Sequence, residues 1–422
     1  MVELAGRAVT REGVLPVASM EFENGLVRKI ERTAGEASGG SIILPGYIDV
    51  HNHGAVGVDV NSATAEDLLR VAEFLARSGV TAWLPTLVPD SEENYARVVS
   101  EIDRLMEMQE GKAVAQAVGV HYEGVYANSH MCGALRPEFF KTYSSGSTTP
   151  AFGPKGGPIA TPPIQEGSDK REPPRPPKGR APLLRKEGSF FGELPKLTRG
   201  VHMMTIAPEI DGGIELVGDL VSDGWVVSIG HTRADAETLD AAFGAGARHV
   251  THFFNAMTGV HHRDLGVAGW ALANPGVTFD IIADGIHVDP RMLDLACRAK
   301  SPAKVCLISD SVAPTGLGDG VYELWGERLT VENGRTRNDR GSIAGSVITM
   351  ADAVRRMRSL GYAWDEIAAM SSGNSARLLG LSGRGSLEAD MRADIVALDD
   401  SGAVVDVWVG GQVVVKSERK EL

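Results

Sequence analysis

The chain has 422 residues, of which 43% are hydrophobic and 23% charged, and this composition is typical of a globular enzyme rather than a fibrous or disordered protein. Its net charge of −13 argues against nucleic acid or an anionic membrane surface as a partner, although a small anionic substrate needs only a local pocket of donors. No apolar run approaches the roughly 18 residues of a membrane span, no signal-peptide pattern is present, and three scattered cysteines do not make a disulfide framework, so we expect a cytoplasmic protein.

Both ends of the chain alternate short β-like runs with turns. The N-terminal runs are LPVASMEF, GLVRKIER and SIILPG, and the C-terminal runs are ADIVALD and GAVVDVWVGGQVVV. Short strands without a helical period cannot bury a core alone, so the two ends are predicted to pair. We therefore expect one small β-sandwich domain built from residues 1–45 and 385–422.

Residues 46–384 have a different rhythm, in which apolar runs of strand length alternate with amphipathic segments of helix length. Apolar strands bounded by helices indicate a parallel sheet that is covered on both faces. Eight repeats favour an α/β fold with a closed (β/α)8 TIM-like barrel over the alternative, an open doubly wound sheet. The predicted strands are 46–50, 81–87, 117–121, 201–207, 226–230, 248–252, 278–282 and 305–309, and the predicted helices include 65–78, 91–109, 235–245, 289–299 and 350–360.

Residues 144–198 interrupt this rhythm. The segment is rich in Pro, Gly, Lys and Arg and poor in large apolar residues, so it cannot bury enough surface to offset its ordering entropy. We expect a flexible Pro/Gly-rich insertion after the third strand. It is either a disordered spacer or a basic lid over the mouth of the barrel.

Side chains typical of metal ligands follow six of the eight predicted strands. Active sites of such barrels lie at the carboxyl ends of the strands. One residue of this kind would most often be a structural group, but six at the same relative position indicate a shared site. In chain order they are His51 and His53, His121 and Glu123, His231, His252, Asp284 and His287, and Asp310.

Imidazole and carboxylate ligands together suit Zn, Fe, Co or Mn better than Mg or Ca. Glu123, His231 and His252 can hold one divalent ion and leave a position open for water. His51 and His53 are separated by one residue, so both can face a second ion that Glu123 would bridge. The sequence therefore predicts one or two divalent metal ions, with Zn as the favoured element.

Asp310 follows the eighth predicted strand, where a carboxylate can reach the water of such a centre. We expect it to act as general base towards that water and then as general acid towards a leaving amine. His121 is expected to orient the carboxylate of Glu123, and Asp284 to shape the turn before His287.

These residues lie in motifs that resemble the amidohydrolase superfamily and, within it, the N-acetylglucosamine-6-phosphate deacetylases. The likeness covers nearly the whole chain except 144–198. The motifs that carry it are PGYIDVHNHG, GVHYEGVYAN, TIAPE, SIGHT, THFFNAM, HHRDLGVAG, DGIHV, ISDS, GSIAGS and NSARLLGL.

The resemblance implies a role for each matching residue. Asp310 would be the catalytic aspartate and His287 would contact the sugar, while Asn255 and Ala256 would receive the phosphate. Arg263 would cross from a neighbouring subunit to the same phosphate, which implies a homodimer. Glu123, His231 and His252 match the family's metal triad, and His51 and His53 match the extra pair of members that hold two ions.

The sequence departs from the family where the substrate is shaped. The family reads HLEGP where this chain has HYEGV, and a substrate-binding GAH where it has Gly133, Ala134 and Leu135. Leucine cannot donate the hydrogen bond with which the histidine polarises the substrate carbonyl. A second metal ion or His130 would then take that role, or the substrate is different.

The expected function is metal-dependent hydrolysis of the acetamide of N-acetylglucosamine 6-phosphate to glucosamine 6-phosphate and acetate. A second hypothesis is a related amidohydrolase that acts on another N-acyl amino sugar or sugar phosphate, or on a cyclic amide. A third, from a different class, is an inactive barrel that binds sugar phosphates as a sensor.

Overall fold

The computed structural model describes residues 6–32, 41–143 and 194–416. The predicted insertion at 144–198 therefore lies outside the described residues, apart from its last five positions, 194–198. Within the described ranges, none of the helices combines the length and the apolar character needed to cross a membrane.

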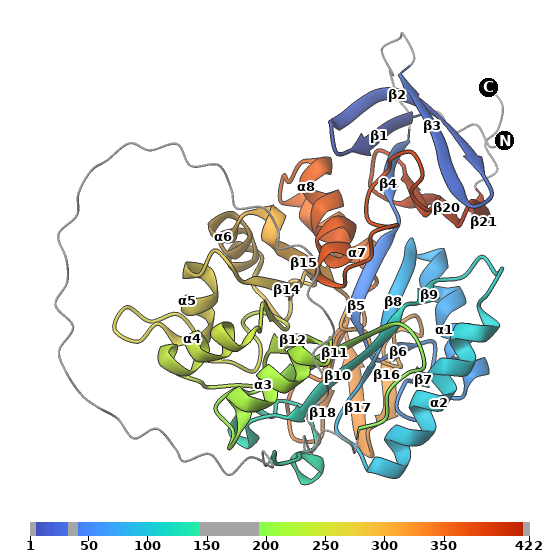
Figure 1. The fold of residues 1–422 in the computed structure, drawn as a ribbon. Helices are drawn as coiled ribbons and strands as arrows, with labels where there is room; N and C mark the ends of the chain where they lie inside the picture. The colour runs from blue at the N-terminus through green and yellow to red at the C-terminus, as the bar shows by residue number, and fades with distance from the viewer. Residues whose placement is uncertain (1–5, 33–40, 144–193, 417–422) are drawn as a thin grey trace, which may run out of the picture.

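Eight parallel strands form a barrel in the lower half of Figure 1. Its first and last strands meet along a short seam, where the amide of Asp310 donates to the carbonyl of His51 and Asn52 pairs with Ser311. The TIM-like barrel is confirmed, because an open doubly wound sheet would leave these two strands at opposite edges. The strands in barrel order are β5 (Tyr47–Asn52), β8 (Val80–Leu87), β10 (Gly119–Tyr126), β11 (Val201–Ile206), β12 (Val226–Ile229), β13 (His249–Val250), β14 (Thr278–Ile282) and β15 (Val305–Ile308).

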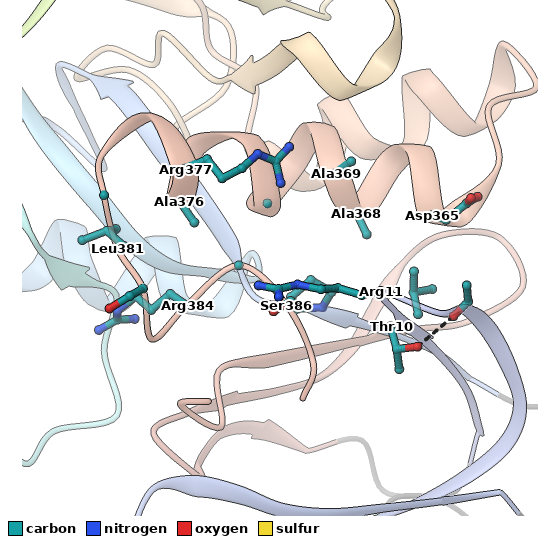
Figure 2. Close-up of a pocket in the computed structure, with 17 residues that line it drawn as sticks. Thr10, Arg11, Asp365, Ala368, Ala369, Ala376, Arg377, Leu381, Arg384 and Ser386 are labelled. Carbon is teal, nitrogen blue, oxygen red and sulfur yellow. Dashed lines mark hydrogen bonds between the residues drawn. The ribbon is translucent and has the colours of Figure 1, made fainter. Parts of the chain in front are cut away.

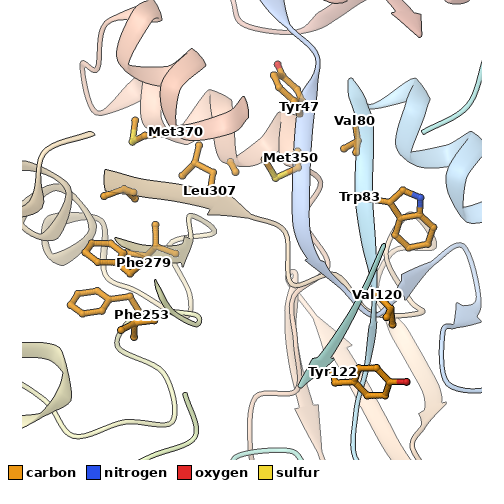
Figure 3. Packing of buried hydrophobic residues seen from close by; sticks show 14 of the residues in the cluster. Tyr47, Val80, Trp83, Val120, Tyr122, Phe253, Phe279, Leu307, Met350 and Met370 are labelled. Atoms are coloured by element: carbon orange, nitrogen blue, oxygen red, sulfur yellow. The ribbon is translucent and has the colours of Figure 1, made fainter. Parts of the chain in front are cut away.

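Helices cover the outer face of the barrel, which explains why its strands are buried along most of their length. All eight residues of β8 are buried, and Figure 3 shows large side chains such as Trp83, Tyr122 and Phe279 packed around the strands. Burial of one such side chain contributes about 1.5–3 kcal/mol to folding. The helices are α1 (Ala65–Arg77), α2 (Glu92–Met108), α3 (Gly213–Ser222), α4 (Ala236–Ala245), α5 (Gly266–Ala273), α6 (Pro290–Lys300), α7 (Met350–Ser359), α8 (Trp364–Ala368) and α9 (Asn374–Leu378).

The five predicted helices correspond to α1, α2, α4, α6 and α7, and each end agrees within one residue. In these helices, the amphipathic pattern and the N-capping residues indicate the same boundaries. In α1, Thr64 caps the first turn and forms a reciprocal capping box with Asp67, while Leu68, Val71 and Leu75 lie on the buried face.

The two ends of the chain form one seven-stranded mixed sheet, drawn above the barrel in Figure 1. Strand β4 lies between a parallel neighbour from the N-terminal end, β1, and an antiparallel neighbour from the C-terminal end, β19. Met20, Ile43 and Trp408 belong to a core of its own. The strands in sheet order are β21 (Gln412–Lys416), β20 (Val404–Val409), β19 (Ile395–Leu398), β4 (Ile42–Pro45), β1 (Gly6–Thr10), β2 (Gly13–Glu23) and β3 (Leu26–Arg32).

Two small antiparallel sheets follow strands of the barrel and were not predicted. A two-stranded sheet, β6 (Gly54–Ala55) and β7 (Val58–Asp59), follows β5 directly. A three-stranded sheet stands between β15 and α7 and consists of β16 (Gly320–Leu324), β17 (Glu327–Glu332) and β18 (Arg335–Asn338). Both supply residues near the carboxyl ends of the barrel strands. The two-residue strand β9 (Gln116–Ala117) pairs with β8 before β10 begins.

Candidate metal and substrate site

Four imidazoles converge on the carboxylate of Glu123 at the carboxyl ends of the strands. Oε1 of Glu123 lies 2.8 Å from Nε2 of His252, 3.1 Å from Nε2 of His231 and 3.4 Å from Nε2 of His51. Its other oxygen, Oε2, lies 3.3 Å from Nε2 of His53. All five residues are at most 4% exposed, although they come from strands far apart in the sequence. The predicted metal ligands therefore share one small volume.

The five residues divide into two groups of three that share Glu123. One contains His231 and His252, whose Nε2 atoms lie 3.0 Å apart, and the other contains His51 and His53, whose Nε2 atoms also lie 3.0 Å apart. Ligand atoms about 2.0–2.2 Å from one zinc ion lie about 3.3 Å from one another. The spacing of both groups is close to that value, so the donor set fits one or two divalent ions.

The outer ring nitrogens hold two of the imidazoles with Nε2 facing the centre. Nδ1 of His231 lies 2.8 Å from the carbonyl oxygen of Met131, and Nδ1 of His53 lies 3.2 Å from that of Thr86. A carbonyl can only accept, so Nδ1–H donates in both cases, and Nε2 is the nitrogen that a metal ion would bind once it has displaced any proton there. This arrangement is common for metal-bound histidine.

The electrostatics of the site favour the binding of a cation. Burial disfavours the charged form of Glu123, yet the surrounding imidazoles, His51 first among them, hold the pKa of Glu123 well below its usual range. Burial also opposes protonation of His53, but the carboxylates of Asp310 and Glu123 outweigh it and raise the pKa of His53 to about 10. Burial also lowers the pKa of His252, but Glu123 outweighs this effect and raises the pKa of His252 to about 9. In the protein alone, imidazolium groups supply positive charge that a metal ion would supply.

Asp310 lies on the side of the histidine pair. Its Oδ1 is 3.4 Å from Nε2 of His53 and 3.6 Å from Nε2 of His51. Burial raises the pKa of Asp310, but the nearby imidazoles outweigh that effect and lower the pKa below its usual value. Asp310 is thus an ionised acceptor beside the ligands, as a general base must be.

Three site residues leave the extended conformation as their strands end. The backbone φ is 48° at His231, 33° at His252 and 49° at Asp310, all in the left-handed region that favours glycine. Turning the chain there aims each side chain over the barrel axis, at a cost of order 1–3 kcal/mol for each residue. Glu123 differs, because it lies inside β10 at a register shift and Gly124 takes the positive φ of 71°.

Two carboxylates, Asp280 and Glu209, hold the turns at His252 and His231 in place. Asp280 accepts a hydrogen bond from the amide of His252 and is paired at 3.0 Å with the buried ring of His249. Glu209 accepts from the hydroxyl of Thr232 and from the amide of Arg233 at 2.7 Å, directly after His231. Each turn is therefore fixed by a group on a neighbouring strand or loop.

A hydrogen-bond network spans the seam between β5 and β15. The side-chain amide of Asn52 donates to Ser311 Oγ at 2.7 Å and to Asp49 Oδ2 at 3.1 Å, and Ser309 Oγ donates to Asp49 Oδ2 at 2.6 Å. Asn52 also accepts from the amide of Gly54 at 3.0 Å. The segment with the histidine pair and the segment with Asp310 are thus tied to each other.

A cavity of about 290 Å³ opens onto the ligands. It contains most of the predicted substrate residues, namely Gly133, Ala134, Asn255, Ala256 and His287, together with Leu135, which is 3% exposed. Sequence reasoning assigned no site role to four further lining residues, Trp325, Ser342, Ile343 and Gly345, although the last three belong to the GSIAGS motif. All four follow the eighth strand, in a stretch where no element was predicted, although alternating residues and the turn pair Asn-Gly signal a hairpin.

Asp284 both shapes its turn and orients His287. Its Oδ1 accepts from the amides of Ile286 and His287 at 2.8 Å, and its Oδ2 lies 2.7 Å from Nδ1 of His287. Burial of the carboxylate is outweighed by these contacts, which lower the pKa of Asp284. Nδ1–H of His287 therefore points to a carboxylate, and Nε2 remains for a ligand in the cavity.

Other predicted residues lie elsewhere. Arg263 is exposed on the loop after β13 and does not line the cavity, and the side chain of His130 is exposed as well. His121 was expected to orient Glu123, but its Nε2 lies 2.8 Å from Oγ1 of Thr205 and its Nδ1 lies 3.1 Å from the carbonyl of Val50. His121 therefore supports the interior of the barrel and packs edge-on against the His51 ring at 4.7 Å.

A second cavity, of about 630 Å³, lies between the seven-stranded sheet and the segment from α8 to Ser386 (Figure 2). Its polar lining includes Arg11, Arg377 and Arg384, and Asp365 supplies its carboxylate. No histidine lines it, so it lacks the donor set of the first cavity. The 290 Å³ cavity is the candidate active site.

Comparison with known proteins gives concordant results. The Amidohydrolase family matches residues 42–414. The N-acetylglucosamine-6-phosphate deacetylase of Bacillus subtilis is 31% identical over 389 residues, which are 92% of this chain and 88% of that protein. The N-acetylgalactosamine-6-phosphate deacetylase of Escherichia coli O157:H7 is 30% identical over 417 residues, 97% and 98% of the two chains.

Among solved structures, a mutant N-acetyl-D-glucosamine-6-phosphate deacetylase from Mycobacterium smegmatis, in complex with N-acetyl-D-glucosamine-6-phosphate, superimposes with a TM-score of 0.80. It is 27% identical to this chain, and the match covers 99% of this chain and all of that one.

Proposed function

The chain belongs to the amidohydrolase family, and from this premise we propose that it hydrolyses the acetamide of N-acetylglucosamine 6-phosphate to glucosamine 6-phosphate and acetate. The observation that carries the proposal is the position of Asp310, whose Oδ1 lies 3.4 Å from Nε2 of His53 at the floor of the cavity. A general base beside two groups of metal ligands is the arrangement that amide hydrolysis requires.

The donor set fits a divalent ion, and Glu123, His231 and His252 would hold it. His51 and His53 would hold a second ion together with Glu123. A bound ion supplies Lewis-acid polarisation of the amide carbonyl and acidifies water at neutral pH. Zn is the element we favour for these nitrogen and carboxylate ligands, and Fe, Co and Mn suit the same set.

The protein's own residues position the substrate and move the proton. Asp310, held ionised at the floor of the cavity, takes a proton on its carboxylate during attack on the amide and returns it to the leaving amine. His287, fixed by Asp284, presents Nε2 to a sugar hydroxyl. Asn255 and Ala256, on the turn after His252, would receive the phosphate.

In this proposal, the segment 133–135 offers no side-chain hydrogen-bond donor to the amide of the substrate. Leu135 is buried and its Cδ1 would lie 2.2 Å from a Cβ added at Gly124, so it fills the space beside the strand that carries Glu123. We propose that this segment contributes shape and backbone contacts only. The exposed position of His130 does not favour it as a substitute donor.

A second candidate substrate is N-acetylgalactosamine 6-phosphate, which differs in the configuration of one hydroxyl. The observation that favours it is the match to the Escherichia coli relative, which covers 97% of this chain and 98% of that protein.

The proposal is tested by measuring acetate release from purified protein with N-acetylglucosamine 6-phosphate, N-acetylgalactosamine 6-phosphate, unphosphorylated N-acetylglucosamine and a cyclic amide. We expect turnover of at least one phosphate ester and much weaker turnover of the unphosphorylated sugar. Binding without turnover in the metal-loaded protein would favour a sensor instead. Turnover of the cyclic amide alone would replace the proposed substrate class.

We further propose a cytoplasmic homodimer. The three cysteines are all free, which agrees with a reducing compartment. Arg263 is exposed and pairs at 2.7 Å with His262 rather than reaching its own cavity, so a second copy would have to receive it. Sedimentation of the wild type and of an Arg263→Ala variant, combined with the KM for the phosphate ester, tests this assignment.

A further inference from the structure

Trp325 occupies a turn position that does not suit a bulky residue. The pairing of Leu324 with Glu327 leaves Trp325 and Gly326 as a two-residue turn, with φ of 53° and 78°. A turn with positive φ at both central residues is of type I′, which favours Asn-Gly. An aromatic residue there is strained, and strain of this kind points to a function.

Another turn of the same sheet serves as an internal comparison. Asn333 and Gly334 join β17 to β18 with φ of 50° and 74°, and Asn333 is exposed outside the cavity. The Asn-Gly pair, which suits this type of turn, thus lies in the turn that is exposed to solvent. The tryptophan stands in the turn that reaches the catalytic cavity.

Two contacts fix the indole of Trp325. Its Nε1–H donates to Oδ1 of Asp59 on β7 at 3.2 Å. Its ring meets the ring of His53 edge to face, with centroids 5.4 Å apart and planes at 79°. The same residue lines the 290 Å³ cavity and a polar groove of about 720 Å³ behind it, so the indole is the partition between them.

The partition lies on the side of the cavity that the acyl group would occupy. Around the closed barrel, β14 and β15 separate β13, with its turn of Asn255 and Ala256, from β5, next to which Trp325 is held. A trans secondary amide places the acyl carbon chain and the carbon on nitrogen on opposite ends of a planar unit. With the sugar phosphate towards β13 and the carbonyl above Glu123, the acyl chain points towards Trp325.

We propose that Trp325 determines acyl-group specificity by closing this end of the cavity, so that acetyl fits and longer chains do not. The inference rests on the proposed amide hydrolysis and extends it to a residue outside the predicted site. Leu135 contributes a further apolar wall residue.

The test compares N-formyl, N-acetyl, N-propionyl and N-butyryl glucosamine 6-phosphate as substrates. Trp325→Asn and Trp325→Gly both suit the turn and remove the partition. We expect each to raise the ratio of kcat/KM for propionyl to that for acetyl by about 10- to 200-fold, the range that one methylene is worth in an apolar pocket, and to raise the ratio for butyryl as well. Trp325→Phe, whose ring is smaller than indole, should admit propionyl better than butyryl.

The matched control is Asn333→Trp, which places the same side chain in the same type of turn away from the cavity. It should lower the melting temperature and leave the acyl profile as in the wild type. Folded Trp325 variants that keep the wild-type acyl profile would overturn the inference. If the wild type releases no acyl group from any sugar phosphate, the proposed function fails instead, so the two failures are distinguishable.

Discussion

The side-chain amide of Asn52 donates a 2.7 Å hydrogen bond to the hydroxyl of Ser311, across the seam where the barrel closes. Both residues are buried, and each is adjacent to a residue of the proposed catalytic centre, His51 and His53 on one side and Asp310 on the other. One contact thus links the closure of the barrel to the relative position of base and ligands.

Replacement of Asn52 by Ala should lower both stability and activity. The change removes the amide donor from Asp49 Oδ2 and Ser311 Oγ and the acceptor from the amide of Gly54 in a buried environment, at a cost of about 1–3 kcal/mol. Urea unfolding monitored by circular dichroism measures it. Lys112→Ala, at an exposed position, is the control and should stay within about 0.5 kcal/mol of the wild type. Equal stability of both variants would show that the network is not important for closure.

Replacement of Asp310 by Asn should abolish hydrolysis while substrate still binds. Asn keeps the shape of the side chain but cannot accept a proton, and loss of a general base typically costs about 10²–10⁴-fold in rate. Initial rates of acetate release and calorimetric binding of N-acetylglucosamine 6-phosphate give the two quantities. Near-normal kcat in this variant would contradict the assignment of the base.

Removal of metal should destabilise the protein. A ligand present at a hundred times its Kd stabilises the folded state by about 2.7 kcal/mol, so chelation should lower the melting temperature and added Zn should restore it. Elemental analysis should find less metal in His252→Gln than in the wild type. His130→Gln, on the surface, is the control and should retain the full metal content. A melting temperature indifferent to chelator would argue against a resident ion.

The contacts that Asp284 makes with His287 should affect the pH dependence of stability at acidic pH. The pKa of Asp284 is lowered in the folded protein, so its contribution is fully present above about 3.9, the ordinary pKa of an aspartate, and is lost as pH falls through the lower folded value. The difference in unfolding midpoint between wild type and Asp284→Asn should therefore be constant at neutral pH and shrink below about pH 4. A difference that grew on acidification would have the wrong sign.

The barrel and the clustering of imidazole and carboxylate groups at its rim could be predicted because their signals are local and repeated. Each apolar run defines a strand, and the residue that follows it must lie at one end of the barrel. This reasoning located His51, His53, His231, His252 and Asp310 before any coordinates. It misplaced Glu123 only in detail, because β10 continues to Tyr126 through a register shift that periodicity does not reveal.

The rest depends on contacts that spacing cannot reveal. His121 faces Thr205 rather than Glu123, since the direction of a buried ring follows from which hydroxyl lies opposite. Trp325 was missed because its role comes from a hairpin that folds back over β5, hundreds of residues away in the chain. The sequence pattern predicts the helices and strands, whereas which loop residues line the cavity depends on tertiary contacts.

Because the backbone is left-handed at His231, His252 and Asp310, selection for stability and selection for activity favour different residues at these positions. Glycine would relieve the torsional penalty at each of these positions, and it would also erase the functional group. A laboratory selection for thermal stability alone should therefore enrich glycine at these positions and yield inactive variants. Selection for catalytic turnover instead retains side chains whose backbone is strained.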